Sequence, residues 1–187
     1  MIKMTPYKLT ILMGILFSPS VFATDINVDF TATVKATTCN ITLTALNGSS
    51  VTDDGNDNYI LRIPNMGLDK IVNKTAEAQA DFKLIASGCS GGISWIDTTL
   101  SGNKSGSSPK LIAPLSSDTS STTSYIGMGI KKINTDDSPN SAEKIRWSLT
   151  EINTDGLSMT VALRETGTGQ GIPGNFRAKA TFNFTYQ

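Results

Sequence analysis

The sequence predicts an all-β fold, a sandwich of two β-sheets, and three of its features support this prediction. Near the carboxyl terminus, apolar and polar side chains alternate strictly from Phe176 to Tyr186, which is the period of a strand with one buried face. The segment 26–34 shows the same alternation near the other end of the chain. The remaining segments add up to seven or more short strands separated by turns, and that spacing is typical of a two-sheet sandwich.

The first 23 residues have the pattern of a secretory signal peptide. Lys3 and Lys8 give a positive start, residues 9–17 form an apolar core, and Val21-Phe-Ala23 supplies a cleavage site. The alternative is a membrane anchor, but the apolar run is shorter than the roughly 20 residues that a spanning helix needs. We therefore expect export of a mature chain that begins at Thr24 and keeps 164 of the 187 residues.

The mature chain has a small net charge and the length of one domain. Two of the 16 basic residues lie in the predicted signal peptide, which leaves 14 against 16 acidic residues, a net charge of about −2. This balance provides no electrostatic footprint for nucleic acid or for anionic lipid.

The chain has two cysteines, Cys39 and Cys89. In an exported protein these residues are expected to pair, and the closed loop of about 50 residues would stabilise the fold by on the order of 4 kcal/mol. The sequence has no Cys-x-x-Cys spacing, which argues against a redox-active pair.

The remaining elements follow from local patterns. Pro64 is expected to end one strand, and Gly127 and Gly129, which share one parity, predict a bend or bulge in another. One of the two tryptophans, Trp95 or Trp147, is expected in the core. Strands are expected over 26–34, 39–46, 59–63, 80–86, 93–100, 125–130, 145–150, 157–164 and 176–186, and loops over 47–58, 101–108, 116–124 and 167–174.

The residues that usually carry catalysis are scarce. The chain has no histidine, the commonest general base and zinc ligand, and its carboxylates are scattered over predicted loops. Residues 169–174 match G-x-G-x-x-G, but a β pattern follows where a helix would be needed. Residues 53–58 resemble a calcium loop in their oxygen ligands, but the sequence lacks the glycine at the sixth position of such a loop and the glutamate at the twelfth. We therefore predict no enzyme activity, no cofactor and no metal site.

The order of these features resembles that of the structural subunits of bacterial chaperone–usher pili, the fimbriae, of the type 1 pilin-like kind. The resemblance covers the whole mature chain. It depends on the Cys39–Cys89 spacing, the Gly88-Cys89 strand end, the glycine-containing segment 125–130, Gly174 near the end, and the penultimate Tyr186.

The resemblance implies an immunoglobulin-like sandwich that lacks its last strand and is completed by a donated one. It divides the chain into a signal peptide (1–23), an N-terminal donor-strand extension (24–38) and a pilin domain (39–187). The donor strand would insert five side chains into a neighbour: Ile26, Val28, Phe30, Ala32 and Val34. Many such subunits have glycine at the fourth of these positions, so the pocket that accepts Ala32 must hold an extra methyl group.

The resemblance also implies a groove beside the last strand that first binds a periplasmic chaperone and then the donor strand of the next subunit. The residues expected to form this groove and the chaperone-binding edge are Gly174, Phe176, Ala178, Ala180, Phe182, Phe184, Tyr186 and Gln187. The implied partners are that chaperone, an outer-membrane usher and neighbouring pilus subunits, including a tip adhesin. The implied function is polymerisation by donor-strand exchange into adhesive fimbriae, after passage through the periplasm to the cell surface.

Three alternatives stay open at this point. The two end strands could pair with each other inside one monomer and complete an ordinary sandwich. The chain could be a secreted single-domain adhesin or lectin-like module, although such a module has no need for the apolar row from Ile26 to Val34. Within the pilin class, the sequence does not separate a minor subunit from a major subunit or a terminator.

Overall fold

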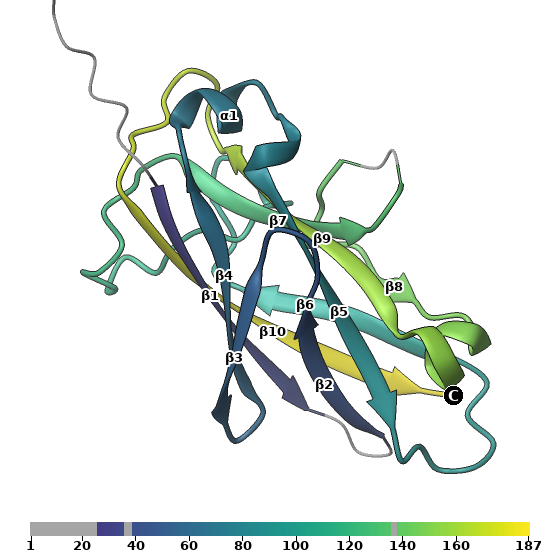
Figure 1. Cartoon of the computed structure of the whole chain (residues 1–187). Helices are drawn as coiled ribbons and strands as arrows, with labels where there is room; N and C mark the ends of the chain where they lie inside the picture. The colour runs from purple at the N-terminus through teal and green to yellow at the C-terminus, as the bar shows by residue number, and fades with distance from the viewer. Residues whose placement is uncertain (1–25, 36–38, 136–137) are drawn as a thin grey trace, which may run out of the picture.

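The protein folds into two β-sheets packed face to face, as a computed structural model that describes residues 26–35, 39–135 and 138–187 shows (Figure 1). Of the first segment, only the side chains of residues 28–32 are described. The predicted signal peptide lies outside the described residues. The expected all-β, immunoglobulin-like sandwich is confirmed.

One sheet has six strands and the other has four. The larger sheet has the order β3 (Ser50–Gly55), β4 (Asn58–Met66), β1 (Ile26–Lys35), β10 (Asn175–Tyr186), β6 (Ile96–Gly102), β8 (Ile145–Arg146). The smaller sheet has the order β2 (Asn40–Ala45), β5 (Gln79–Ser87), β9 (Leu157–Glu165), β7 (Ile126–Lys132). Three short helical turns complete the described elements: α1 (Leu68–Val72), a 3-10 turn (Ala76–Ala78) and a π turn (Glu151–Asp155).

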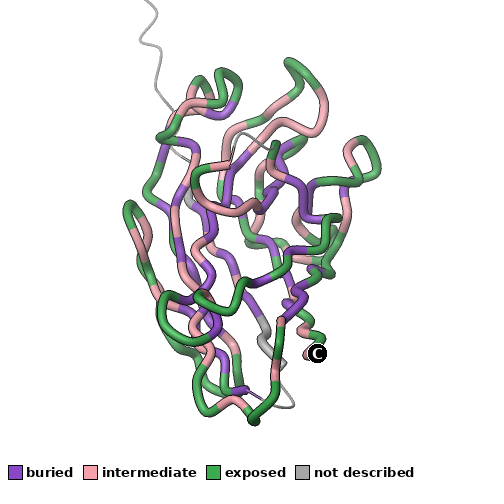
Figure 2. The backbone as a smooth tube through the Cα atoms, turned by 90° about the vertical axis from the view of Figure 1, so that its right-hand side faces the viewer, coloured by how far each residue is buried: buried purple, intermediate pink, exposed green. Residues whose placement is uncertain are grey.

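The core lies between the two sheets, and aromatic rings join them. Buried residues alternate with less buried ones along β2, β4, β5 and β10, whereas β7 and β9 are buried along most of their length. Figure 2 shows the buried segments in purple. Phe182 of the larger sheet meets Phe82 of the smaller sheet edge to face, with ring centroids 6.0 Å apart, and meets Phe30 at 6.2 Å. All three side chains are fully buried. Such edge-to-face pairs add to the stabilisation that burial of the rings provides.

Trp147 is the core tryptophan. It is fully buried, and its indole Nε1 donates a hydrogen bond of 2.7 Å to Thr98 Oγ1, so its polar atom is satisfied inside the core. Trp95 is half-buried and lies just before β6, where the Arg146 guanidinium stacks 4.9 Å from its ring centroid. The second arrangement is a cation–π contact near the surface.

The expected loop over 47–58 is wrong in part, because it contains strand β3. Strands β3 and β4 form an antiparallel hairpin, and the turn has positive φ at Gly55 (78°), Asn56 (53°) and Asp57 (59°). Gly, Asn and Asp tolerate this left-handed backbone, which suits the twist of a tight hairpin. The segment was missed because β3 lies at the sheet edge and its residues are mostly exposed, so it has little hydrophobic alternation.

Pro64 does not end its strand, because β4 continues to Met66. The pairing with β1 shifts register between the Val28–Ile63 and Ile26–Met66 pairs, which leaves Pro64 in a bulge. A bulge is one of the few places in a sheet where the missing N–H of proline is tolerated.

The bulge expected in residues 125–130 is also wrong. Strand β7 pairs with β9 without a register shift from Ile126 to Lys132. The glycines instead allow other segments to approach the strand. A Cβ atom at Gly129 would lie 2.6 Å from Pro139 Cβ, and one at Gly127 would lie 2.9 Å from Leu111 Cβ. Glycine is therefore needed here for close backbone approach rather than for a bend.

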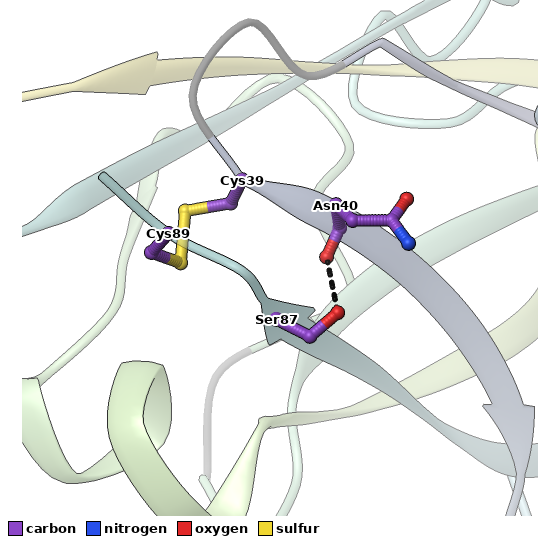
Figure 3. The surroundings of a disulfide bond; sticks show 4 residues. All are labelled: Cys39, Asn40, Ser87 and Cys89. Atoms are coloured by element: carbon purple, nitrogen blue, oxygen red, sulfur yellow. Dashed lines mark hydrogen bonds between the residues drawn. A yellow bond between two sulfur atoms is a disulfide. The ribbon is translucent and has the colours of Figure 1, made fainter.

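The predicted disulfide between Cys39 and Cys89 is confirmed, and it joins neighbouring strands of the smaller sheet (Figure 3). Cys39 precedes β2 and Cys89 follows β5, with their Cα atoms 4.1 Å apart. Beside it, Ser87 Oγ donates a hydrogen bond of 3.3 Å to the Asn40 carbonyl oxygen. The bond therefore fixes the point at which the chain enters the sandwich after β1.

Candidate functional site: the groove between β4 and β10

The N-terminal strand β1 lies inside the larger sheet, between β4 and β10. It pairs with β10 in parallel from Asn27–Asn175 to Lys35–Asn183, and with β4 in antiparallel orientation. Among the strand pairs of the described chain, β1–β10 is parallel and the other named pairs are antiparallel. Figure 1 shows the purple β1 alongside the yellow β10. The two end strands are thus partners within one chain, as one of the sequence alternatives had it.

β4 and β10 flank a groove, and the inward face of β1 fills this groove at the positions whose side chains are described. Val28, Phe30 and Ala32 are each 0% exposed. Phe30 lies opposite Ala178 of β10 and Leu61 of β4, so the largest inserted side chain stands beside a small one. Matched large and small residues are what close packing requires.

The other two predicted members of this row are placed by backbone register alone. Ile26 pairs with Met66 and Val34 pairs with Phe182. Both positions share the parity of Val28, Phe30 and Ala32, and their side chains lie outside the described part.

The predicted groove residues of β10 line the other side of this strand. Phe176, Ala180 and Phe182 are fully buried, and Ala178 is nearly so. Phe184 is partly buried and packs edge to face on Trp147, with centroids 6.2 Å apart. The row that the sequence predicts is therefore one continuous apolar wall, and it becomes more exposed towards the carboxyl end.

The carboxyl end of β10 holds two buried polar atoms that lack a hydrogen bond. The Tyr186 hydroxyl oxygen and the Trp95 Nε1 atom are both inaccessible and unpaired. Burial raises the pKa of Tyr186 to about 12. Gln187 itself is exposed, and its backbone pairs with Trp95 through hydrogen bonds of 3.0 and 3.1 Å.

Gly174 lies at the opposite end of the groove, just before β10. A Cβ atom there would be 2.6 Å from Thr122 Oγ1 and 2.9 Å from the Thr122 backbone. The Thr122 and Thr123 amides donate to the Asn175 carbonyl oxygen at 2.8 and 3.2 Å. Gly174 is therefore required for the loop that holds the start of β10.

The outward face of β1 carries a charged cluster that the sequence analysis missed. Asp29 Oδ1 accepts a hydrogen bond of 3.2 Å from Arg62 Nε, and Asp29 Oδ2 lies 3.9 Å from Arg177 Nε. Arg62 belongs to β4 and Arg177 to β10, so the cluster spans all three strands. The available signal was that Asp29 is the one charged residue among the outward positions 27–33.

A second ion cluster joins β6 and β8, at the edge of the same sheet that lies opposite β3. The buried Asp97 of β6 accepts hydrogen bonds of 2.7 and 2.8 Å from Arg146 of β8, and Lys144 Nζ lies 3.2 Å away. The Arg146 hydrogen bonds lower the pKa of Asp97 to about 2, against the opposing effect of desolvation.

The described residues contain no group of three or more potential metal ligands from His, Cys, Asp and Glu. In the same part of the chain, no helix is long and apolar enough to cross a membrane.

The fold and this groove together define a class: pilin-like subunits, in which a terminal strand completes an immunoglobulin-like sheet. A family model described as "Fimbrial protein" matches residues 28–187, and the chain belongs to this family. It is 75% identical over 192 residues to the "Uncharacterized fimbrial-like protein YadM" of Escherichia coli (strain K12), with 100% of both chains covered. The protein is a fimbrial subunit. Its family consists of structural proteins that are generally non-enzymatic. Such proteins associate with other pilus subunits in cell-surface appendages.

Proposed function

We propose that this chain polymerises by donor-strand exchange in a chaperone–usher pilus, so that β1 leaves its own groove and enters that of a neighbouring subunit. One observation carries the proposal. Strand β1 is central in its sheet, yet it is the first described element of the chain. In the predicted mature chain, which begins at Thr24, only two residues precede β1, so this central strand could be withdrawn without unthreading another described element.

Withdrawal of β1 would leave a surface that needs another strand. Strands β4 and β10 would each lose a backbone partner, and both rows of apolar side chains would face water. Phe176, Phe182, Leu61 and Ile63 are among the buried residues that would become exposed. An open edge beside an apolar trough is a site for strand addition from another chain.

The remaining partners in this proposal act before the fibre forms. A periplasmic chaperone lends a strand to the groove and contacts the β10 edge, where Phe184 and Tyr186 are partly exposed. An outer-membrane usher then brings the donor segment 24–38 of the next subunit to the groove of domain 39–187. A tip adhesin is among the neighbours, and the finished fibre serves cell adhesion.

A labelled peptide with the sequence of residues 24–36, mixed with the full mature chain, tests the proposal. The wild-type peptide is expected to be captured as an SDS-resistant complex. The Phe30→Asp peptide is expected to fail, because an unpaired carboxylate would enter an apolar pocket. The matched control is Thr31→Asp, which places the same charge on the outward face and should still be captured. Equal capture of all three peptides, or of none, would contradict the proposal.

A second candidate function, a secreted single-domain adhesin or lectin-like module, is favoured by one observation. The chain closes its own groove with β1, so it is complete without a partner. Gel filtration over time separates the two candidates, because an adhesin stays monomeric at any concentration. A pilin converts into higher oligomers as the concentration and the incubation time increase.

A further inference from the structure

We infer that Arg62 and Arg177 form a clamp that selects an incoming strand by a carboxylate on its outward face. This inference deepens the proposed strand exchange and rests on it. It assigns to the groove a polar specificity in addition to the apolar row.

The two arginines lie at the same level on either side of the groove. Arg62 and Arg177 are both the direct register partners of Asp29. Because neighbouring strands are spaced about 4.8 Å apart, the two arginines face each other across the width of one strand. Any strand that fills the groove, in either direction, must place one residue between them.

The chemistry of this position favours an acidic residue. Among the described residues, Asp29 is the ion-pair partner of both guanidinium groups, so removal of its strand leaves two like charges at the groove. In the closed monomer the Asp29 carboxylate lies between them, 3.2 Å from one Nε and 3.9 Å from the other. The next outward level differs, because Thr31 stands between Ile60 and Lys179. That level has one cation instead of two, so the preference for a carboxylate is strongest between Arg62 and Arg177.

The clamp determines the register of the inserted strand, which the apolar row alone does not fix. A slip of one residue turns the polar face inward and is excluded by burial. A slip of two residues keeps apolar side chains inward, so the alternation alone does not exclude it. Such a slip would place Asn27 or Thr31 between the arginines and would leave both without an anion. Asp29 therefore fixes the register, and the matching partner is a strand with Asp or Glu at this level, such as a second copy of this chain.

Peptide capture by the full mature chain tests the clamp. The Asp29→Asn version of the 24–36 peptide is expected to be captured about two- to tenfold less than the wild-type peptide, the range for two partly exposed ion pairs. The ratio should shrink in about 1 M NaCl, which screens exposed charges. In the Arg62→Gln/Arg177→Gln variant, the two peptides should be captured equally. The Phe30→Asp peptide should still be rejected, which shows that the apolar groove of the variant is intact.

Equal capture of the wild-type and Asp29→Asn peptides by the wild-type chain would overturn the clamp while leaving strand exchange in place. If no peptide is captured, the proposed strand exchange is wrong, and the interaction of Asp29 with the two arginines is then tested in the closed monomer. A double-mutant cycle measures this interaction. It compares the unfolding midpoints of three variants: Asp29→Asn, Arg62→Gln/Arg177→Gln and the triple variant. Additive shifts would overturn the clamp, whereas a triple variant no less stable than the double variant would support it.

Discussion

Phe30 has the largest side chain among the described inward positions of β1, and it is fully buried against residues of β4 and β10. The family resemblance implies that Phe30 inserts into the groove of a neighbouring subunit. The structure shows that the same side chain also belongs to the core of the closed monomer. Alternation identifies which side chains are buried, but it does not identify the chain in which they are buried.

We therefore expect Phe30→Ala to destabilise the isolated monomer by about 3–5 kcal/mol, the usual loss for a buried aromatic ring. Thr31→Ala, on the outward face of the same strand, should stay within about 0.5 kcal/mol of wild type. Urea unfolding followed by circular dichroism measures both. An unchanged midpoint for Phe30→Ala would mean that β1 does not occupy its own groove in solution.

Asp97 gives a prediction about acid stability. Its pKa falls from an ordinary value of 3.8 to about 2 in the folded chain, so the unfolded state binds the proton more readily. The stabilisation is fully present above 3.8 and is lost as the pH falls through about 2. Asp97→Asn should therefore lower the thermal midpoint at about pH 7 and have much less effect at about pH 2. A constant difference across this range would contradict the assignment, and Asp54→Asn on exposed β3 is the control.

At the scale of elements, the end strands were the most predictable parts of the fold because their alternation is long and uninterrupted. β1 and β10 appear close to their predicted bounds, with the expected parity buried at positions 28–32 of β1 and 176–182 of β10. Their mutual parallel pairing was not predictable from the alternation. A two-residue period indicates which face of a strand is buried, but it does not indicate which strand lies alongside. Edge strand β3 and the bulge at Pro64 were missed, since both depend on neighbours rather than on local apolar pattern.

The disulfide links β2 and β5 at their ends, so its removal should weaken the smaller sheet. We expect the Cys39→Ser/Cys89→Ser variant to lose about 2–5 kcal/mol of stability and to yield less soluble protein in the periplasm. The double substitution avoids a leftover reactive thiol. An unchanged unfolding midpoint and a normal yield would show that the bond is not structural.

The last four residues of the chain, Phe184 to Gln187, are predicted to form the chaperone-binding edge. Their removal deletes the Phe184–Trp147 contact and the backbone pairing between Gln187 and Trp95. We expect the shortened chain to be exported but not to co-purify with its periplasmic chaperone. Thr185→Ala, on the exposed face of β10, should co-purify normally. Co-purification of the shortened chain would refute this role.

At the scale of the whole molecule, the proposed exchange gives one sequence two states that share the same groove. In the closed monomer the groove holds β1, and in the proposed fibre it holds the strand of a neighbour. The closed state protects the apolar trough while no partner is present. Under the proposed strand exchange, the chain forms a fibre only after β1 leaves its own groove, so the release of this strand would control assembly.

A reversible lock on β1 tests this dependence directly. Thr31 of β1 and Ile60 of β4 are antiparallel register partners on the outward face, and such partners have Cα separations of about 4.5–5.5 Å, within the range of a disulfide. We expect the oxidised Thr31→Cys/Ile60→Cys variant to remain monomeric and to capture no peptide. Mild reduction should restore both assembly and peptide capture. The wild-type chain under the same reductant controls for loss of the Cys39–Cys89 bond. If the oxidised variant still assembles, then β1 does not need to leave its groove, and donor-strand exchange is not how this subunit polymerises.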